Sequence, residues 1–433
     1  MLMNVAHINQ VDDQATDPGN DRINKQTTIA AEFVIKPGAV VKNRLFKSAM
    51  SEQLGDRNHN PTPGLIALYS AWAQGGIGLC MTGNLMVDRT QLGEPKNIVL
   101  DERSDLAMFR EWALAAKQNQ TLCWAQLNHP GKQVPSFISK EPLAPSAVPL
   151  EGDLQTNFKC PRALEKHEIM AIVQQFATSA ALAKEVGFGG VQIHGAHGYL
   201  VNQFLSSRHN KRHDEFGGSL ENRMRFVLSI YREIREKVGD DFPVGIKLNS
   251  ADFMKGGFTE EESLEVLKAL SQVGIDLIEV SGGSYEVTAM ADGIDQKDST
   301  IKREAYFLDY AEKARALIDT PLVVTGGFRS TQGMNEALQS GATDMIGIAR
   351  PLAVDPNMPK KALSDATFKV ELKPLSTGFS RLDRMVLLNM SWYEAQLDRI
   401  ANGRPPKPNL SEWFATYKVL SHLGVYAFRK RRA

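Results

Sequence analysis

The stretch that decides the fold reads Gly190-Val191-Gln192-Ile193-His194-Gly195-Ala196-His197-Gly198-Tyr199-Leu200. It begins as a short apolar run and ends in a segment with two histidines, two glycines and a tyrosine. An apolar run that stops at such a cluster predicts a buried strand with polar side chains at its carboxyl end. In proteins that repeat strand and helix, this is the face where ligands bind. We therefore predict an active site at His194, His197 and Tyr199.

Seven further apolar runs, separated by segments of helix length, accompany this strand. The eight predicted strands are 44–50, 77–83, 121–127, 190–194, 243–248, 277–280, 322–325 and 344–347. One intervening segment places Ile169, Ile172 and Phe176 on one helical face, and another opens with a capping box at Thr259. Strands linked through helices pair in parallel. An open doubly wound sheet usually has fewer strands, so the α/β class predicted here is a closed (β/α)8 TIM barrel.

Three regions are expected along the chain. Residues 1–28 are polar and aperiodic and predict an N-terminal arm, residues 29–360 form the barrel, and residues 361–433 form a helical C-terminal extension. The aromatic residues of that extension suggest that it packs on the barrel or forms the interface of a homo-oligomer. The long connections 84–104, 128–166 and 284–300 are expected to set substrate specificity.

Composition narrows the function. The 433 residues carry no formal net charge, and 42% are hydrophobic, as in a globular protein with no polyanionic partner such as nucleic acid. No run approaches the roughly 18–20 apolar residues that a membrane span needs. Three scattered cysteines, Cys80, Cys123 and Cys160, lack metal or redox spacing. They argue against a disulfide framework, so we expect a cytoplasmic protein.

Several segments at strand ends carry a resemblance to a known family. They are 42–45, 125–132, 206–226, 324–328 and 347–351, the last reading Gly347-Ile348-Ala349-Arg350-Pro351. With the histidine cluster they make the chain, over about residues 30 to 360, similar to the Old Yellow Enzyme family of FMN-dependent NAD(P)H oxidoreductases. The resemblance implies a (β/α)8 barrel with FMN as cofactor and NADH or NADPH as electron donor.

The phosphate of FMN is expected in the loops after the seventh and eighth strands. Gly326 and Gly327 would let the backbone approach it, and Arg350 would supply a charged fork. The alternative is that the glycines only make a strand-to-helix turn.

The remaining cofactor positions follow from the same resemblance. Ser48, Ala49, Met50 and Ser51 match the segment against the flavin ring. Ser51 stands where relatives often have Cys or Thr, and its hydroxyl can donate a hydrogen bond toward the flavin O4 atom.

Two buried polar side chains are expected at the pyrimidine edge of the flavin. Gln126 matches a glutamine that hydrogen-bonds this edge, and Lys247 would pair with it when it is anionic. A snorkelling lysine, or a salt bridge with a core carboxylate, is the alternative for Lys247. The match to the family pattern is looser at Gly83-Asn84 and at Ala349.

The opening cluster becomes the substrate side of the same site. The resemblance implies that His194 and His197 bind the activating oxygen of a substrate, and that Tyr199 protonates its α-carbon after hydride reaches the β-carbon. A metal site is an alternative for His-x-x-His, but the His-Glu-x-x-His context of a helix is missing. We expect no metal. A purely structural pair of core histidines is the other alternative.

The expected activity is reduction of an activated, enone-type alkene, a small-molecule substrate, by hydride transfer from FMN. An NADH oxidase that uses oxygen or a quinone is the alternative enzyme. A non-catalytic binder of flavin or a steroid-like ligand is the alternative outside enzymology.

Overall fold

The computed structural model describes residues 27–139, 141–151, 158–283 and 304–430. Nearly all of the expected arm and the whole of the 284–300 connection lie outside these residues. Eight parallel strands close into a barrel, because the first strand pairs with both the last and the second. The strands are β3 (Leu45–Lys47), β4 (Leu79–Met86), β6 (Leu122–Asn128), β9 (Val191–Gly195), β10 (Val244–Asn249), β11 (Leu277–Ser281), β12 (Leu322–Thr325) and β13 (Met345–Ile348). The predicted TIM barrel is confirmed.

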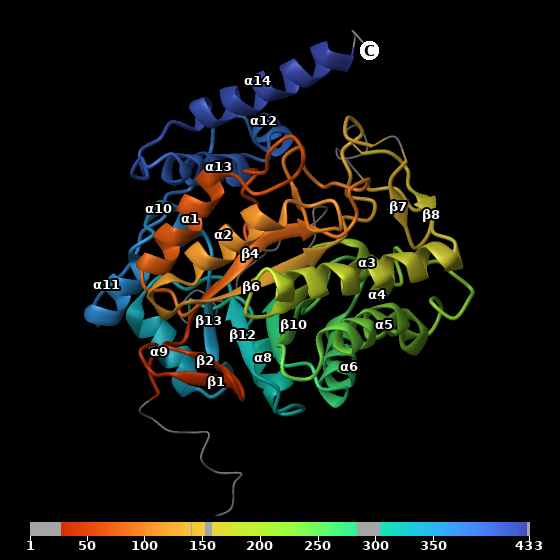
Figure 1. Cartoon of the computed structure of the whole chain (residues 1–433), viewed down its shortest axis with the longest axis horizontal. Coiled ribbons are helices and arrows are strands. Elements are labelled where there is room, and N and C mark those ends of the chain that lie inside the picture. Colours follow the sequence, from red (N-terminus) through yellow and green to blue (C-terminus); the bar gives the residue numbers. More distant parts are fainter. Residues whose placement is uncertain (1–26, 140, 152–157, 284–303, 431–433) are drawn as a thin grey trace, which may run out of the picture.

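Helices surround the strands (Figure 1). The longer ones are α1 (Pro63–Gln74), α2 (Leu106–Ala116), α3 (Lys166–Glu185), α5 (Leu220–Val238), α6 (Glu260–Gln272), α8 (Leu308–Arg315) and α9 (Thr331–Gln339), with shorter α4 (Leu200–Leu205), α10 (Arg350–Val354) and α11 (Met358–Ser364). The predicted capping box opens α6, since Thr259 accepts from the Glu262 amide while Glu262 caps in return. The apolar stripe of α3 is buried against the barrel as expected.

The interior of the barrel is packed with large side chains near the amino ends of its strands. Trp124 lies there with Phe46 and Met345. Its indole ring packs so closely on Gly190 that a Cβ atom at that position would lie only 2.6 Å from the ring. An antiparallel hairpin, β1 (Phe33–Lys36) and β2 (Ala39–Val41), covers this cluster. Figure 1 places the hairpin at the end of the molecule opposite the C-terminal helices. One end of the barrel is therefore sealed, which leaves the carboxyl ends of the strands for the site.

The C-terminal extension packs on the barrel, which is one of the two arrangements that the sequence suggested. It contains α12 (Ser380–Met385), α13 (Leu388–Ala401) and α14 (Glu412–Lys430). Helix α13 packs against α1 and α10, and its buried Trp392 donates to the Leu410 carbonyl oxygen at 3.0 Å. The aromatic side chains of Trp413, Phe414 and Tyr417 on α14 are exposed.

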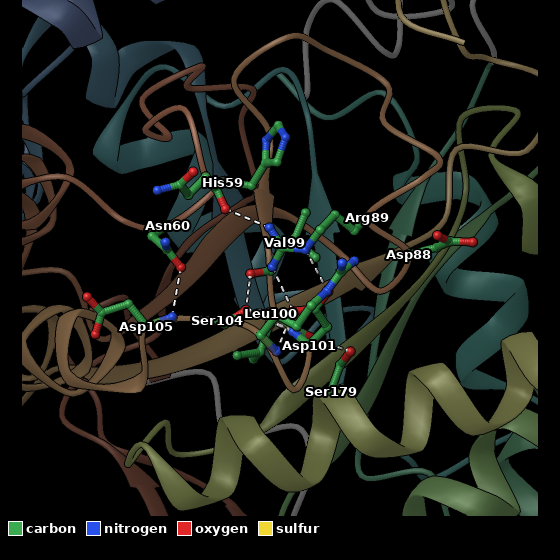
Figure 2. A network of polar contacts seen from close by, with 12 residues as sticks. His59, Asn60, Asp88, Arg89, Val99, Leu100, Asp101, Ser104, Asp105 and Ser179 are labelled. Carbon is green, nitrogen blue, oxygen red and sulfur yellow. Dashed lines mark hydrogen bonds and ion pairs between the residues drawn. The ribbon is translucent and has the colours of Figure 1, made fainter. Parts of the chain in front are cut away.

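The long connection after β4 is ordered by polar contacts (Figure 2). Its strand β5 (Ile98–Val99) pairs with β4, and the Val99 amide donates to the His59 carbonyl oxygen at 2.9 Å. Arg89 forms a two-pronged ion pair with Asp101, and Ser179 of α3 donates to the Leu100 carbonyl oxygen at 2.6 Å. The segment that carries Glu94 is thus tied at both ends.

The connection after β6 contains a small parallel pair of its own, β7 (Leu143–Ala144) and β8 (Arg162–Ala163). A 3-10 turn, η1 (Gln118–Gln120), precedes β6. None of the helices in the described ranges is long and apolar enough to cross a membrane.

Candidate active site

A cavity of about 320 Å³ opens at the carboxyl ends of the barrel strands. It brings together almost every residue that the sequence predicted for the site: Ser48, Ala49, Met50, Ser51, Gln126, His194, His197, Tyr199, Lys247, Gly326, Gly327, Ala349 and Arg350. Gly83 is the exception. It does not line this cavity, and its amide donates to the Tyr69 hydroxyl at 2.8 Å behind it. Its neighbour Asn84 lines the cavity instead.

His194 and His197 follow β9 and present their rings to the cavity together with Tyr199. The ring centroid of His194 lies 5.2 Å from that of His197 and 4.8 Å from that of Tyr199, both edge to face. The Ala196 amide donates to His194 Nδ1 at 3.3 Å, so a neutral ring carries its proton on Nε2. Burial, with the His197 and Lys247 charges, holds the pKa of His194 well below its ordinary value. His194 is therefore a neutral hydrogen-bond donor.

His197 is held in a left-handed backbone conformation that residues other than glycine rarely adopt. Its φ is 59°, and its amide donates to Asn249 Oδ1 at 3.1 Å while its carbonyl oxygen accepts from Gln133 at 3.0 Å. Its Nε2 lies 2.7 Å from the Ser281 hydroxyl. Burial, followed by the Lys247 charge, lowers its pKa well below the ordinary value. Such local strain persists where surrounding contacts fix it, and it is common at functional sites.

Tyr199 reaches the cavity from the start of α4. Its hydroxyl oxygen accepts from Asn84 Nδ2 at 3.3 Å, and Asn84 lies on β4, beside Gln126 of β6. The phenol is 6% exposed. The hydrogen bond from Asn84 fixes the position of the phenol oxygen at the cavity wall.

Lys247 already has a partner within the protein. Its Nζ lies 3.0 Å from Glu279 Oε1, and both side chains are buried on adjacent strands. Glu279 also accepts from Thr325 at 2.8 Å and from Gln192 at 2.9 Å. The salt bridge with a core carboxylate, which was the alternative for this lysine, is therefore formed, and its pairing with the cofactor stays a prediction. Lys247 nevertheless lines the cavity.

Gln126 has an unused acceptor at the cavity wall. Its amide nitrogen donates to Gln192 at 2.7 Å, but no donor in the described residues reaches its buried Oε1. A buried acceptor without a donor costs free energy, so a bound ligand with an N–H group would satisfy it.

Two guanidinium groups gather at the far side of the cavity. Arg350 was predicted, and Arg329 was not. Burial and the neighbouring Arg350 lower the pKa of Arg329, as expected for two like charges held close together. Gly326 and Gly327, which line the same cavity, have φ values of 113° and 101°, which favour glycine. A bound dianion would relieve the repulsion, and a phosphate group fits this arrangement.

Ser51 makes contacts that its sequence position did not indicate. Its Oγ lies 2.7 and 2.6 Å from the two carboxylate oxygens of Glu94, and 3.0 Å from Glu394 Oε1. Its hydroxyl is therefore engaged with two carboxyl groups, and the expected hydrogen bond toward the flavin O4 atom stays a prediction. Beside it, Ser48 Oγ lies 2.8 Å from Thr325 Oγ1.

Sequence reasoning missed the residues that tertiary packing delivers. Helix α13 forms one wall of the cavity with Asn389, Met390, Tyr393, Glu394 and Leu397. Nothing near these residues in the sequence marks them. Arg329 was accessible to sequence reasoning, since a cation directly after Gly326-Gly327-Phe328 is a typical companion of a phosphate loop.

Comparisons with known proteins identify the family of the chain. Residues 33–367 match the model of the NADH:flavin oxidoreductase / NADH oxidase family. The NADH-dependent flavin oxidoreductase iliE of Hypocrea jecorina is 38% identical over 366 residues, which are 77% of this chain and 90% of the relative. The NADH oxidase of Thermoanaerobacter brockii is 35% identical over 329 residues, which are 75% of this chain and 49% of that protein.

Two solved structures are similar to this chain in fold. The old yellow enzyme homologue from Zymomonas mobilis superposes with a TM-score of 0.69 and 25% identity, over 80% of this chain and 95% of its own. A 2-naphthoyl-CoA reductase superposes with a TM-score of 0.72 and 27% identity over 78% of this chain, but over only 52% of its own length.

Proposed function

Because the chain belongs to the NADH:flavin oxidoreductase / NADH oxidase family, we propose that it reduces activated alkenes such as enones. It is an FMN-dependent oxidoreductase. FMN, when bound, supplies the hydride chemistry, accepting from a nicotinamide cofactor and giving to an acceptor. The observation that carries the proposal is the cluster of His194, His197 and Tyr199 on one cavity wall.

The residues present fit FMN. Arg329 and Arg350, with Gly326 and Gly327, would hold its phosphate, and the free acceptor on Gln126 would take an N–H of its ring system. Lys247, which pairs with Glu279 and also lines the cavity, would contact the edge of the flavin that gains negative charge on reduction.

The histidines and the tyrosine would act on the substrate. A neutral His194 donates from Nε2 to a carbonyl oxygen without bringing a full charge into the cavity. The oxygen gains negative charge as the alkene is reduced, so a donor fixed in advance lowers the barrier. Tyr199, oriented by Asn84, would then give its proton to the adjacent carbon.

An NADH oxidase activity with oxygen or a quinone as acceptor is the second candidate. The observation in its favour is the similarity to the Thermoanaerobacter NADH oxidase.

Purified protein tests both. We expect a flavin spectrum that is bleached anaerobically by NADH or NADPH, and reoxidised faster by cyclohexenone than by oxygen. Phenols should give a charge-transfer band by binding at His194 and His197. Reoxidation by oxygen alone at the full turnover rate would favour the oxidase, and a flavin that neither nicotinamide bleaches would overturn both.

A further inference from the structure

Three side chains from distant parts of the chain meet beside the cavity. Ser51 follows β3, Glu94 lies in the connection after β4, and Glu394 lies on α13 of the C-terminal extension. The Ser51 hydroxyl oxygen is within 2.6 Å of one carboxylate and 3.0 Å of the other. Ser51 and Glu394 line the cavity, and Glu94 lies immediately behind them.

The number of protons in this cluster follows from its geometry. A serine hydroxyl has a single proton, and an ionised carboxylate can only accept. With both glutamates ionised, Ser51 could donate to one of them, while its oxygen would face the other acceptor at hydrogen-bond distance. Both contacts become favourable when one carboxyl group is protonated and donates to the serine oxygen. The cluster then holds two protons in a chain from acid to hydroxyl to carboxylate.

The surroundings favour the same state. Burial, then the Glu394 carboxylate and more weakly Glu52, raise the pKa of Glu94 to about 8. Burial raises the pKa of Glu394, and this effect outweighs the hydrogen bonds from Gln53 and Ser51 and the charge of Lys418 on α14, which lower it. Lys418 also pairs with Asp398 at 3.0 Å.

The other contacts of the pair are neutral. Gln53 donates to Glu394 Oε2 at 2.9 Å, and Asn97 donates to Glu94 at 3.3 Å. Two like charges in one buried site are avoided by retaining a proton, as in other carboxylate pairs.

We propose that Glu94 and Glu394 share one proton through the Ser51 hydroxyl, and that they act as positioning residues that fix Ser51 as a hydrogen-bond acceptor on the cavity wall. The proton of Ser51 is used within the dyad, so the lone pair that remains faces the cavity. A ligand group that carries a proton is favoured there over a bare carbonyl oxygen.

A consequence for FMN rests on the proposed function. Reduction adds negative charge to the flavin, and loss of the shared proton adds negative charge to the wall that Ser51 and Glu394 form. The two processes oppose each other. The midpoint potential of the bound flavin should therefore fall more steeply with pH above about 8, where Glu94 loses its proton.

Infrared spectroscopy of the flavin-free full chain tests the shared proton directly. At neutral pH, the difference spectrum of wild type minus Glu94→Gln should show the carbonyl stretch of a protonated carboxyl group, and so should wild type minus Glu394→Gln. Other buried acids such as Glu52 cancel in these differences. Glu371→Gln, at an exposed carboxyl, should show no such band. Loss of the band in both variants supports sharing, and a band that persists in either variant overturns it.

Ser51 supplies a second arm. Ser51→Thr keeps the hydroxyl and should keep the band and its midpoint near pH 8, whereas Ser51→Ala should shift that midpoint. An unchanged midpoint in Ser51→Ala would overturn the role of the hydroxyl.

The flavin-loaded protein tests the coupling. The difference in midpoint potential between wild type and Glu94→Gln should widen as the pH rises through about 8. A difference that is independent of pH would overturn the coupling while leaving the infrared result standing. Failure to bind flavin would refute the proposed function, and the infrared arms would still decide on the dyad.

Discussion

Replacement of Lys247 by methionine separates its structural role from its proposed role at the cofactor. The variant leaves the Glu279 carboxyl group buried without its cation, 3.0 Å from where the ammonium stood. Breaking a buried pair in this way costs about 3–5 kcal/mol. Glu279 keeps its bonds from Thr325 and Gln192, so we expect a loss near the lower limit, about 3 kcal/mol in the free energy of unfolding.

The second change neutralises the carboxylate. In Lys247→Met with Glu279→Gln no charge is left unpaired, and the amide oxygen still accepts from Thr325 or Gln192. We expect most of the lost stability to return. FMN affinity should remain reduced in the double variant, by about tenfold, because one charge-assisted contact worth about 1.5 kcal/mol is still missing.

The assays are urea denaturation of the flavin-free chain and quenching of FMN fluorescence on binding. Lys268→Met removes an exposed lysine and serves as the control, with an expected change within about 0.5 kcal/mol. A single variant as stable as wild type would refute the buried-pair argument. A double variant that binds FMN like wild type would show that Lys247 serves only the core.

Three further predictions concern other parts of the site. Tyr199→Phe should lower the rate of alkene reduction about 10²–10⁴-fold in stopped-flow reoxidation, while flavin reduction by NADH is unchanged; equal loss in both half-reactions would contradict a proton-donor role. Arg329→Gln removes a charged contact to the phosphate, so FMN affinity should fall at least about tenfold. The change also removes repulsion against Arg350, so the melting temperature of the flavin-free chain should stay the same or rise, and a lower melting temperature would argue for a structural arginine. Burial, then the Lys132 charge, lowers the pKa of His209 to about 3, so the folded chain keeps this ring neutral while the unfolded chain protonates it below about pH 6.5. Stability should fall as the pH drops from about 6.5, less steeply in His209→Gln, and equal slopes would exclude His209 as a source.

The prediction from sequence succeeded where one short segment carried the whole signal. His194, His197 and Tyr199 lie within six residues at the end of β9, so their strand alone brings them to the cavity. Gly83 shows the limit of this reasoning. On β4 its neighbour Asn84 lines the cavity instead, because adjacent side chains of a strand point to opposite faces and the looser family match did not fix the register.

Ser51 shows a second limit. Its place at the end of β3 was visible, but its partners Glu94 and Glu394 are 43 and 343 residues away. The direction in which a hydroxyl donates depends on those partners and not on the serine itself. The same holds for Lys247, whose need for a counter-ion was evident while the identity of Glu279 was not.

The sequence by itself therefore determined the barrel, its strand ends and the place of the His194 cluster at the cavity, because apolar periodicity and local spacing act over a few residues. The tertiary structure alone decided how charges are paired around the cavity: Lys247 with Glu279, Arg329 beside Arg350, and Glu94 with Glu394 across Ser51. Charges interact through space, so their partners are set by the closure of the barrel and by the docking of α13, and not by position along the chain.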